Sequence, residues 1–182
     1  YLEIVRMPLS RAREMIAAGA WLAAARRLEE RIRERPGDAQ LHAEAAACYE
    51  MVVGRHQDAS AHWNEHLRLL LLARSSDEAL ERFRGLIERF QPEDFDPALL
   101  MRLGAAYEAA GDDEAALPAL MAVVEAHPES EQAPEAALRA AGVYARTSRS
   151  EHARALLEAL QARWPESAAA LTASTRLREM EE

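Results

Sequence analysis

Residues 100–130 read LMRLGAAYEAAGDDEAALPALMAVVEAHPES. Two stretches rich in Ala, Leu and Glu, which favour helices, flank the turn signal Gly111-Asp112-Asp113. Helices joined by so short a turn pack side by side in opposite directions. Small residues, among them Gly104 and Ala116, stand in the middle of the two stretches, where large apolar side chains usually fill a core. The segment therefore predicts an antiparallel helix pair with unusually small side chains at its centre.

The composition of the whole chain predicts an all-α fold. Of its 182 residues, 49% are hydrophobic, 29% are charged and only 5% are aromatic. No stretch alternates apolar and polar residues as a half-buried strand does. The length suits one domain or one short array of repeats. Every basic residue other than histidine is Arg, which together with the abundant Ala indicates a GC-rich bacterial genome.

The charge argues against nucleic acid as a partner, because nucleic-acid binding relies on basic surfaces. The net charge is −9, and residues 91–138 contain eleven acidic residues and one Arg. This acidic centre allows two interpretations. It either favours a basic partner or serves as a solvated face that keeps the protein soluble.

The sequence contains no recognisable catalytic or cofactor site, so we expect no enzyme and no cofactor. His62 and His66 are one helical turn apart, a spacing that can bind zinc, but no third ligand is evident and we expect no metal. The one cysteine, Cys48, lies among Ala residues and is expected to be buried. The longest apolar run, residues 69–73, is far shorter than the ~20 residues of a membrane span.

Regularly spaced Gly, Pro and Ser signals divide the chain into short helices, with Gly19 as one of the expected breaks. Asp96, which precedes a proline, and Ser167 are expected N-caps. Ser148 with Glu151 fits the S-x-x-E capping box. The ten expected helices span residues 8–18, 20–35, 39–53, 56–73, 76–90, 97–110, 112–126, 132–146, 150–163 and 168–180.

An internal repeat is evident in the C-terminal half. A Tyr, a Leu, an Ala and a Pro each recur 37 residues further along the chain, and four markers with one offset indicate a repeated unit. The matched pairs are Tyr107 and Tyr144, Leu120 and Leu157, Ala116 and Ala153, and Pro128 and Pro165.

Residues 97–130 closely resemble the tetratricopeptide repeat, a unit of about 34 residues. In that family, small residues let the two helices of a repeat approach tightly, while Tyr and large aliphatic side chains fill the space between repeats. Gly104 and Ala116 would be the contact points, where a larger side chain would force the helices apart. The residues that carry the resemblance are Leu103, Gly104, Tyr107, Gly111, Asp112, Ala116, Leu120, Val123 and Pro128.

The resemblance covers most of the chain and implies a single domain, residues 1–182. Residues 134–167 form a second clear repeat, and residues 8–38 and 39–90 form degenerate ones, in which the helix at 76–90 looks like a second half without its own first half. Residues 168–182 would be a polar terminal cap. The implied fold is a right-handed α–α superhelix of antiparallel helix pairs that resemble tetratricopeptide repeats, with a C-terminal capping helix.

In this family, the first helix of each pair lines a concave groove that binds an extended peptide or a partner helix. Chaperone-binding members clamp a C-terminal carboxylate there with Lys, Arg and Asn, and that clamp is absent here. Met and Ala with a few acids suit an apolar or a basic partner segment. The residues that the resemblance places on the groove are Glu50, Met51, Met101, Ala105, Glu108, Leu138 and Arg146.

Two functions fit these observations. The first is a non-catalytic protein–protein interaction scaffold that binds a peptide or helix through the groove. The second is a regulatory or oligomerisation domain of a larger bacterial protein, anchored in a membrane only through a region outside this sequence. Arg6, Arg11 and Arg13 would suit a stretch just cytoplasmic of a membrane span, whereas the alternative is an ordinary first repeat. The sequence does not fix the location: the cytoplasm, with or without a tether to the bacterial inner membrane, is favoured over the periplasm.

Overall fold

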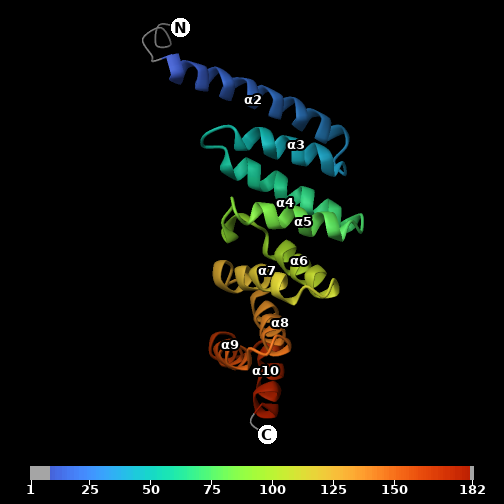
Figure 1. Ribbon diagram of the computed structural model, residues 1–182, viewed down its shortest axis with the longest axis vertical. Coiled ribbons are helices and arrows are strands. Elements are labelled where there is room, and N and C mark those ends of the chain that lie inside the picture. Colours follow the sequence, from blue (N-terminus) through green and yellow to red (C-terminus); the bar gives the residue numbers. More distant parts are fainter. Residues whose placement is uncertain (1–8, 181–182) are drawn as a thin grey trace. The chain divides into compact units, whose positions relative to one another are not determined.

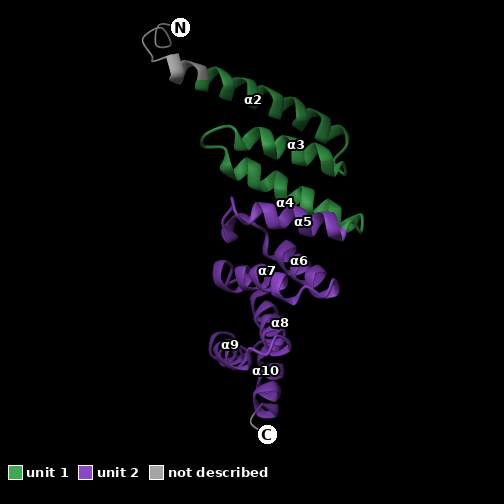
Figure 2. Cartoon of the chain, viewed as in Figure 1, with its two compact units in different colours: residues 1–75 green, residues 76–182 purple. Residues whose placement is uncertain are grey.

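The computed structural model describes residues 9–180, with side chains from Glu14 onward, and every regular element within them is a helix (Figure 1). The predicted all-α fold is therefore confirmed. The chain divides into two compact units, residues 1–75 and residues 76–182 (Figure 2). The boundary falls inside the expected degenerate repeat of residues 39–90, so that its last helix belongs to the second unit.

The first unit is a stack of long helices in which α2 packs on α3 and α3 packs on α4. Ala25, Ala45, Ala46 and Ala59 are completely buried, which lets the helix backbones approach one another closely. Cys48 is buried as predicted. The helices of its described residues are α2 (Leu9–Glu34), α3 (Ala39–Glu50) and α4 (His56–Leu72).

The predicted helix break at Gly19 is wrong, because α2 continues through this residue without interruption for 26 residues. Gly19 is exposed, and no heavy atom lies within 4 Å of the position that a Cβ would occupy. A single Gly lowers helix stability by only about 1 kcal/mol relative to Ala. The Ala, Leu, Glu and Arg residues on both sides are strong helix formers and offset that loss.

The second unit contains the two clear repeats. Helices α6 to α9 each pack on the next, α5 packs on α6, and α10 packs on both α8 and α9. Helix α5 ends four residues earlier than predicted, and the connection to α6 includes one 3₁₀ turn. The elements are α5 (Ser76–Leu86), η1 (Pro92–Asp94), α6 (Pro97–Ala109), α7 (Asp113–Ala126), α8 (Ala133–Arg146), α9 (Ser150–Arg163) and α10 (Ala168–Glu179).

A close contact joins α6 to α7 at Gly104. A Cβ on Gly104 would lie 2.7 Å from Cδ2 and 2.9 Å from Cγ of Leu120, which is itself completely buried. Ala116, on the same helix as Leu120, is also completely buried. The prediction that these small residues allow a close approach of α6 and α7 is therefore confirmed.

The helix ends agree with most of the predicted caps. The side chains of Asp96 and Ser167 accept hydrogen bonds from the backbone N–H groups three residues further on, as expected of N-caps. The capping box at Ser148 is wrong, because the N-cap of α9 is Arg149 and makes no side-chain cap bond. Ser148 instead adopts a left-handed conformation with φ 60°, like Gly111 (φ 77°) at the same position of the preceding repeat.

No helix in the described range, residues 9–180, is both long enough and apolar enough to cross a membrane. Of the three arginines that suggested a membrane-proximal stretch, Arg6 lies outside the described residues. The side chains of Arg11 and Arg13 lie outside them as well.

A cluster of ring side chains joins the three helices of the first unit. His42 of α3 and His62 of α4 face each other with 3.1 Å between their Nδ1 atoms. Nε2 of His42 lies 3.3 Å from the carbonyl oxygen of Pro36 and therefore carries a hydrogen, which leaves Nδ1 to accept from His62 when both rings are neutral. The ring of Tyr49 stacks on His62, and its hydroxyl donates to Glu29 of α2.

The surroundings favour the neutral form of His62. Burial and the neighbouring His42 lower its pKa, while the carboxylates of Glu29 and Asp58 raise it and only partly compensate. Nε2 of His62 lies 4.0 Å from Oε1 of Glu29. The packing of α2, α3 and α4 therefore depends on an imidazole that resists protonation.

The first unit should lose stability in mild acid. The unfolded chain binds a proton at His62 near pH ~6.5, and the folded chain binds it only at lower pH. The contribution of His62 to the free energy of unfolding is therefore fully present above that pH and decreases as the pH falls below it. We expect amide exchange in α3 and α4, corrected for its intrinsic pH dependence, to accelerate in mild acid, and His62→Gln to remove most of this acceleration.

The exposed His56 provides the matched control, since His56→Gln should leave the pH dependence of exchange unchanged. A His62→Gln variant with the same acid acceleration as the unaltered protein would contradict this account.

Enlarging Gly104 should destabilise the second unit. Gly104→Val places branched carbons against Leu120 and should lower the free energy of unfolding by about 1–3 kcal/mol. Gly85 in α5 is the control, because its Cβ position is open, and Gly85→Ala should stabilise by about 0.5–1 kcal/mol. Urea denaturation followed by circular dichroism measures both values. Equal effects of the two substitutions would contradict the close-approach account.

Candidate protein-binding site

One face of α6 carries three of the predicted groove residues. Met101, Ala105 and Glu108 follow a spacing of four and three residues, which places them on one side of the helix, and all three are partly exposed. Leu103 and Tyr107 are buried on another side, and the Tyr107 hydroxyl donates to the backbone carbonyl of Leu80 in α5 at 2.9 Å. Packing against α5 and α7 therefore fixes the direction in which Met101 and Ala105 point.

Helix α8 carries the other two predicted groove residues of the second unit. Arg146 is half exposed at the end of the helix, whereas Leu138 is buried, with 7% of its surface exposed. The guanidinium of Arg176 in α10 donates to the backbone carbonyl of Leu138 at 3.2 Å. The Leu138 end of this face is therefore covered by the last helix, and the Arg146 end remains accessible.

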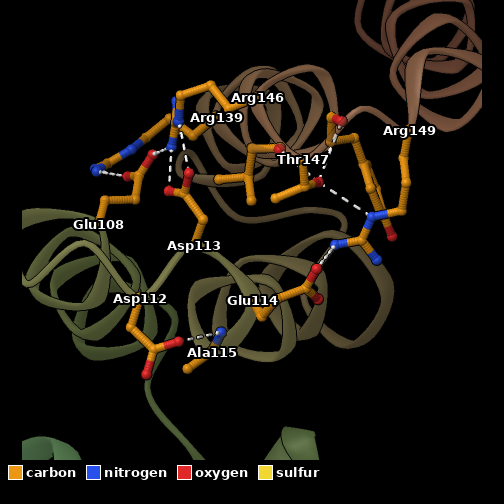
Figure 3. A network of polar contacts seen from close by, with 11 residues as sticks. Glu108, Asp112, Asp113, Glu114, Ala115, Arg139, Arg146, Thr147 and Arg149 are labelled. Atoms are coloured by element: carbon orange, nitrogen blue, oxygen red, sulfur yellow. Dashed lines mark hydrogen bonds and ion pairs between the residues drawn. The ribbon is translucent and has the colours of Figure 1, made fainter.

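An ion-pair network links the predicted residues Glu108 and Arg146 directly (Figure 3). Arg146 Nη2 lies 2.9 Å from Oε1 of Glu108 and 2.7 Å from Oδ1 of Asp113. Glu108, which is mostly buried, also pairs with Arg139. The network therefore ties α8 to the preceding repeat and holds both of these charges in place.

Two further ion pairs neutralise the acidic cluster at the start of α7. Arg149 binds Glu114 at 2.7 Å, and Arg84 of α5 binds Asp112 at 2.5 Å. The acidic excess of residues 91–138 is thus partly neutralised by arginines from neighbouring helices. These acids therefore offer a basic partner less free charge than the sequence suggests.

The same network sets the protonation of its members. Hydrogen bonds from Arg146 lower the pKa of the Asp113 carboxyl. Hydrogen bonds to Asp113 and Glu108 raise the pKa of the Arg146 guanidinium. Both partners therefore remain charged throughout the physiological pH range.

The remaining two predicted groove residues lie in the first unit. Glu50 accepts a hydrogen bond from Nε1 of Trp63 at 2.5 Å. Met51 forms the C-cap of α3, and 57% of its surface is exposed. The seven residues therefore divide between the two units, with five of them on α6 and α8.

The two histidines with zinc-like spacing have different neighbours. His62 pairs with His42, while Nδ1 of His66 lies 2.8 Å from the carbonyl oxygen of Ala39. No group of three His, Cys, Asp or Glu side chains suited to a metal ion is found in the part of the chain that the structure describes.

Several members of the network were not predicted as site residues. Arg139 and Arg146 are seven residues apart and therefore share a face of α8, a signal that the sequence contained. Asp113 is the first residue of α7, and Arg149 is the N-cap of α9. The contacts of Asp113 with Arg146 and of Arg149 with Glu114 depend on how successive repeats stack, which no local spacing reveals.

The low pKa of Asp113 provides a test of this network. Arg146→Ala should return the pKa of the Asp113 carboxyl toward its usual value, as measured by NMR titration of the side-chain carbonyl. Arg149→Ala, which removes the contact to Glu114, should leave the pKa of Asp113 unchanged. A titration of Asp113 that is the same with and without Arg146 would contradict the assigned contact.

One protein family and several solved structures are similar to this chain. Residues 98–130 match the tetratricopeptide repeat family. The structure of a Podosopora anserina putative kinesin light chain with nearly identical repeats of this type aligns with a TM-score of 0.50 and 21% identity, over 87% of this chain and 82% of that chain. YrrB, described as a tetratricopeptide-repeat protein with an unusual peptide-binding site, aligns with a TM-score of 0.45 and 19% identity, over 86% and 84%. MamA aligns with a TM-score of 0.46 and 11% identity, over 86% and 95%.

A search of curated protein sequences found no match. The matched segment, residues 98–130, contains α6 and α7 with their contact at Gly104. The resemblance inferred from Gly104, Tyr107 and Ala116 is thereby confirmed, and the kinesin light chain repeats share the helical fold. The family match covers residues 98–130, and for the rest of the chain the likeness to solved structures shows the fold alone.

Proposed function

We propose that this chain is a non-catalytic scaffold that binds a peptide or helix of a protein partner along one face of α6 and α8. Tetratricopeptide repeats serve as protein–protein interaction scaffolds, and the family match supports this general role. The face, which we call the groove face, consists of the accessible residues Met101, Ala105, Glu108 and Arg146 together with the covered Leu138, and its counterpart in the first unit is Glu50 and Met51 at the end of α3.

The observation that carries the proposal is a partly exposed apolar strip beside fixed charges. Met101 and Ala105 lie on the side of α6 that also presents Glu108, which Arg146 holds in place. The ion pairs between α6 and α8 already hold Glu108 and Arg146 in place. Binding therefore does not carry the entropic cost of ordering these two side chains. Met adapts its shape to different apolar partners. The paired acids offer little free charge, so apolar contact supplies most of the affinity.

A second function rests on a different surface. Helix α2 exposes Met15, Ile16 and Trp21, with 50%, 69% and 40% of their surfaces accessible. Large apolar side chains gathered on one helix often mark a contact with another protein surface. This observation favours a regulatory or oligomerisation domain, in which α2 packs on another part of a larger protein or on a second copy.

The groove face can be tested with peptides selected from a random displayed library against this chain. Met101→Glu should weaken the binding of the selected peptides by about tenfold or more, because it places a charge in the apolar strip. Leu171→Glu is the matched control on the exposed side of α10, where 73% of the leucine is accessible, and it should leave affinity unchanged. Fluorescence anisotropy measures both. Equal losses, or no loss with Met101→Glu, would contradict the proposal.

Light scattering over a range of concentrations separates the two functions. The scaffold function predicts a monomer whose peptide binding is unaffected by Ile16→Glu. A dimer that persists on dilution and dissociates in the Ile16→Glu variant would instead support the oligomerisation function.

A further inference from the structure

A hollow of about 310 Å³ opens between α8, α9 and α10 in the second unit. Its volume lies at the lower end of the ~300–1,000 Å³ that is usual for ligand pockets. The hollow exists because α8 contributes only Ala141, Gly142 and Ala145 to its wall. Leu157 of α9 and Met180 of α10 add further apolar surface. The space is therefore suited to an apolar side chain.

The wall of this hollow also contains the guanidinium of Arg176, for which no ion pair is found within the described residues 14–180. A Cβ on Gly142 would lie 3.3 Å from Nη1 of Arg176 and 3.6 Å from Nη1 of Arg146, so that two guanidinium groups flank this glycine. Arg146 is neutralised by two carboxylates. Arg176 donates to the carbonyl of Leu138, and among residues 14–180 no carboxylate lies within ion-pair distance of it. The charge of Arg176 is therefore available to a ligand.

We infer that this hollow binds an acidic, apolar segment of a partner protein, with an apolar side chain inside and a neighbouring Asp or Glu carboxylate on Arg176. The inference rests on the proposed function and adds the chemical class of the partner. A guanidinium presents several N–H donors in one plane, which suits a carboxylate, and a charge-assisted hydrogen bond is stronger beside apolar surface than in water. The glycine at position 142 keeps the approach to Arg176 open.

We expect a side-chain carboxylate rather than the terminal carboxylate of a peptide. Glu179, which is exposed, lines the same hollow, so an anion that comes close to it meets a like charge. A side-chain carboxylate can reach Arg176 at the edge while the peptide backbone stays outside. We therefore expect an internal sequence of an apolar residue next to Glu or Asp.

Three labelled peptides with blocked ends test this inference: fluorescein-Gly-Ser-Ala-Leu-Glu-Ala-Gly-amide and its counterparts with Gln or Arg in place of Glu. Anisotropy titrations up to millimolar protein should show the Glu peptide binding about tenfold or more tightly than the Gln peptide, and the Arg peptide most weakly. In the Arg176→Gln variant, the preference for Glu over Gln should disappear.

A second variant separates loss of the charge from loss of the hollow. Ala145→Leu should fill the space without touching Arg176, and it should weaken the Glu and Gln peptides by the same factor. The matched control, Ala155→Leu, adds the same side chain to an exposed position of α9 and should change neither affinity. Circular dichroism and thermal unfolding establish that all variants remain folded.

The outcomes distinguish this inference from the proposed function. Equal binding of the Glu and Gln peptides, or a Glu preference that survives in Arg176→Gln, would overturn the inference. Binding unaffected by Ala145→Leu would overturn it as well, as would no binding of any peptide. In each of these cases, selected library peptides that still depend on Met101 would leave the proposed function standing.

Discussion

The contact between Gly104 and Leu120 is the constraint on which the second unit depends. A Cβ on Gly104 would overlap the buried Leu120 side chain, so a larger residue would require Leu120 or the two helices to shift. This contact fixes the rotation of α6 about its axis. In this orientation the Tyr107 hydroxyl is hydrogen-bonded to α5, and Met101 is directed away from the core. It also places Glu108 where Arg139 and Arg146 of the next repeat reach it. The site is thus a consequence of helix packing.

Several ion pairs in the second unit join one helix or helix end to another. The sequence has its acids concentrated in residues 91–138, and most of the arginines that neutralise them come from neighbouring parts of the chain. Asp112 pairs with α5, Asp113 with α8, and Glu114 with the residue before α9. Partly exposed ion pairs each stabilise weakly, but a connected network orients the helices it joins. Net charge along the sequence is therefore a poor guide to the charge that a partner meets.

Much of the fold could be predicted from the sequence because Pro, Gly and cap residues mark helix ends locally. Asp96 and Ser167 begin helices as expected, and the small residues Gly104 and Ala116 predicted the close contact. Gly19 was misleading, since a glycine in a strongly helical context need not break the helix. The hollow beside Arg176 could not be predicted, because it depends on which helix of another repeat lies opposite the small side chains of α8.

Methyl NMR tests most directly whether the groove face is the binding surface. With a peptide selected against this chain, the methyl signals of Met101 and Ala105 should shift on titration, while those of Leu171 and Ala155, on exposed sides of α10 and α9, should not. Shifts of Met101 and Ala105 without shifts of Leu171 and Ala155 would agree with the account. Shifts centred on Leu171 or Ala155, with Met101 and Ala105 unchanged, would contradict it.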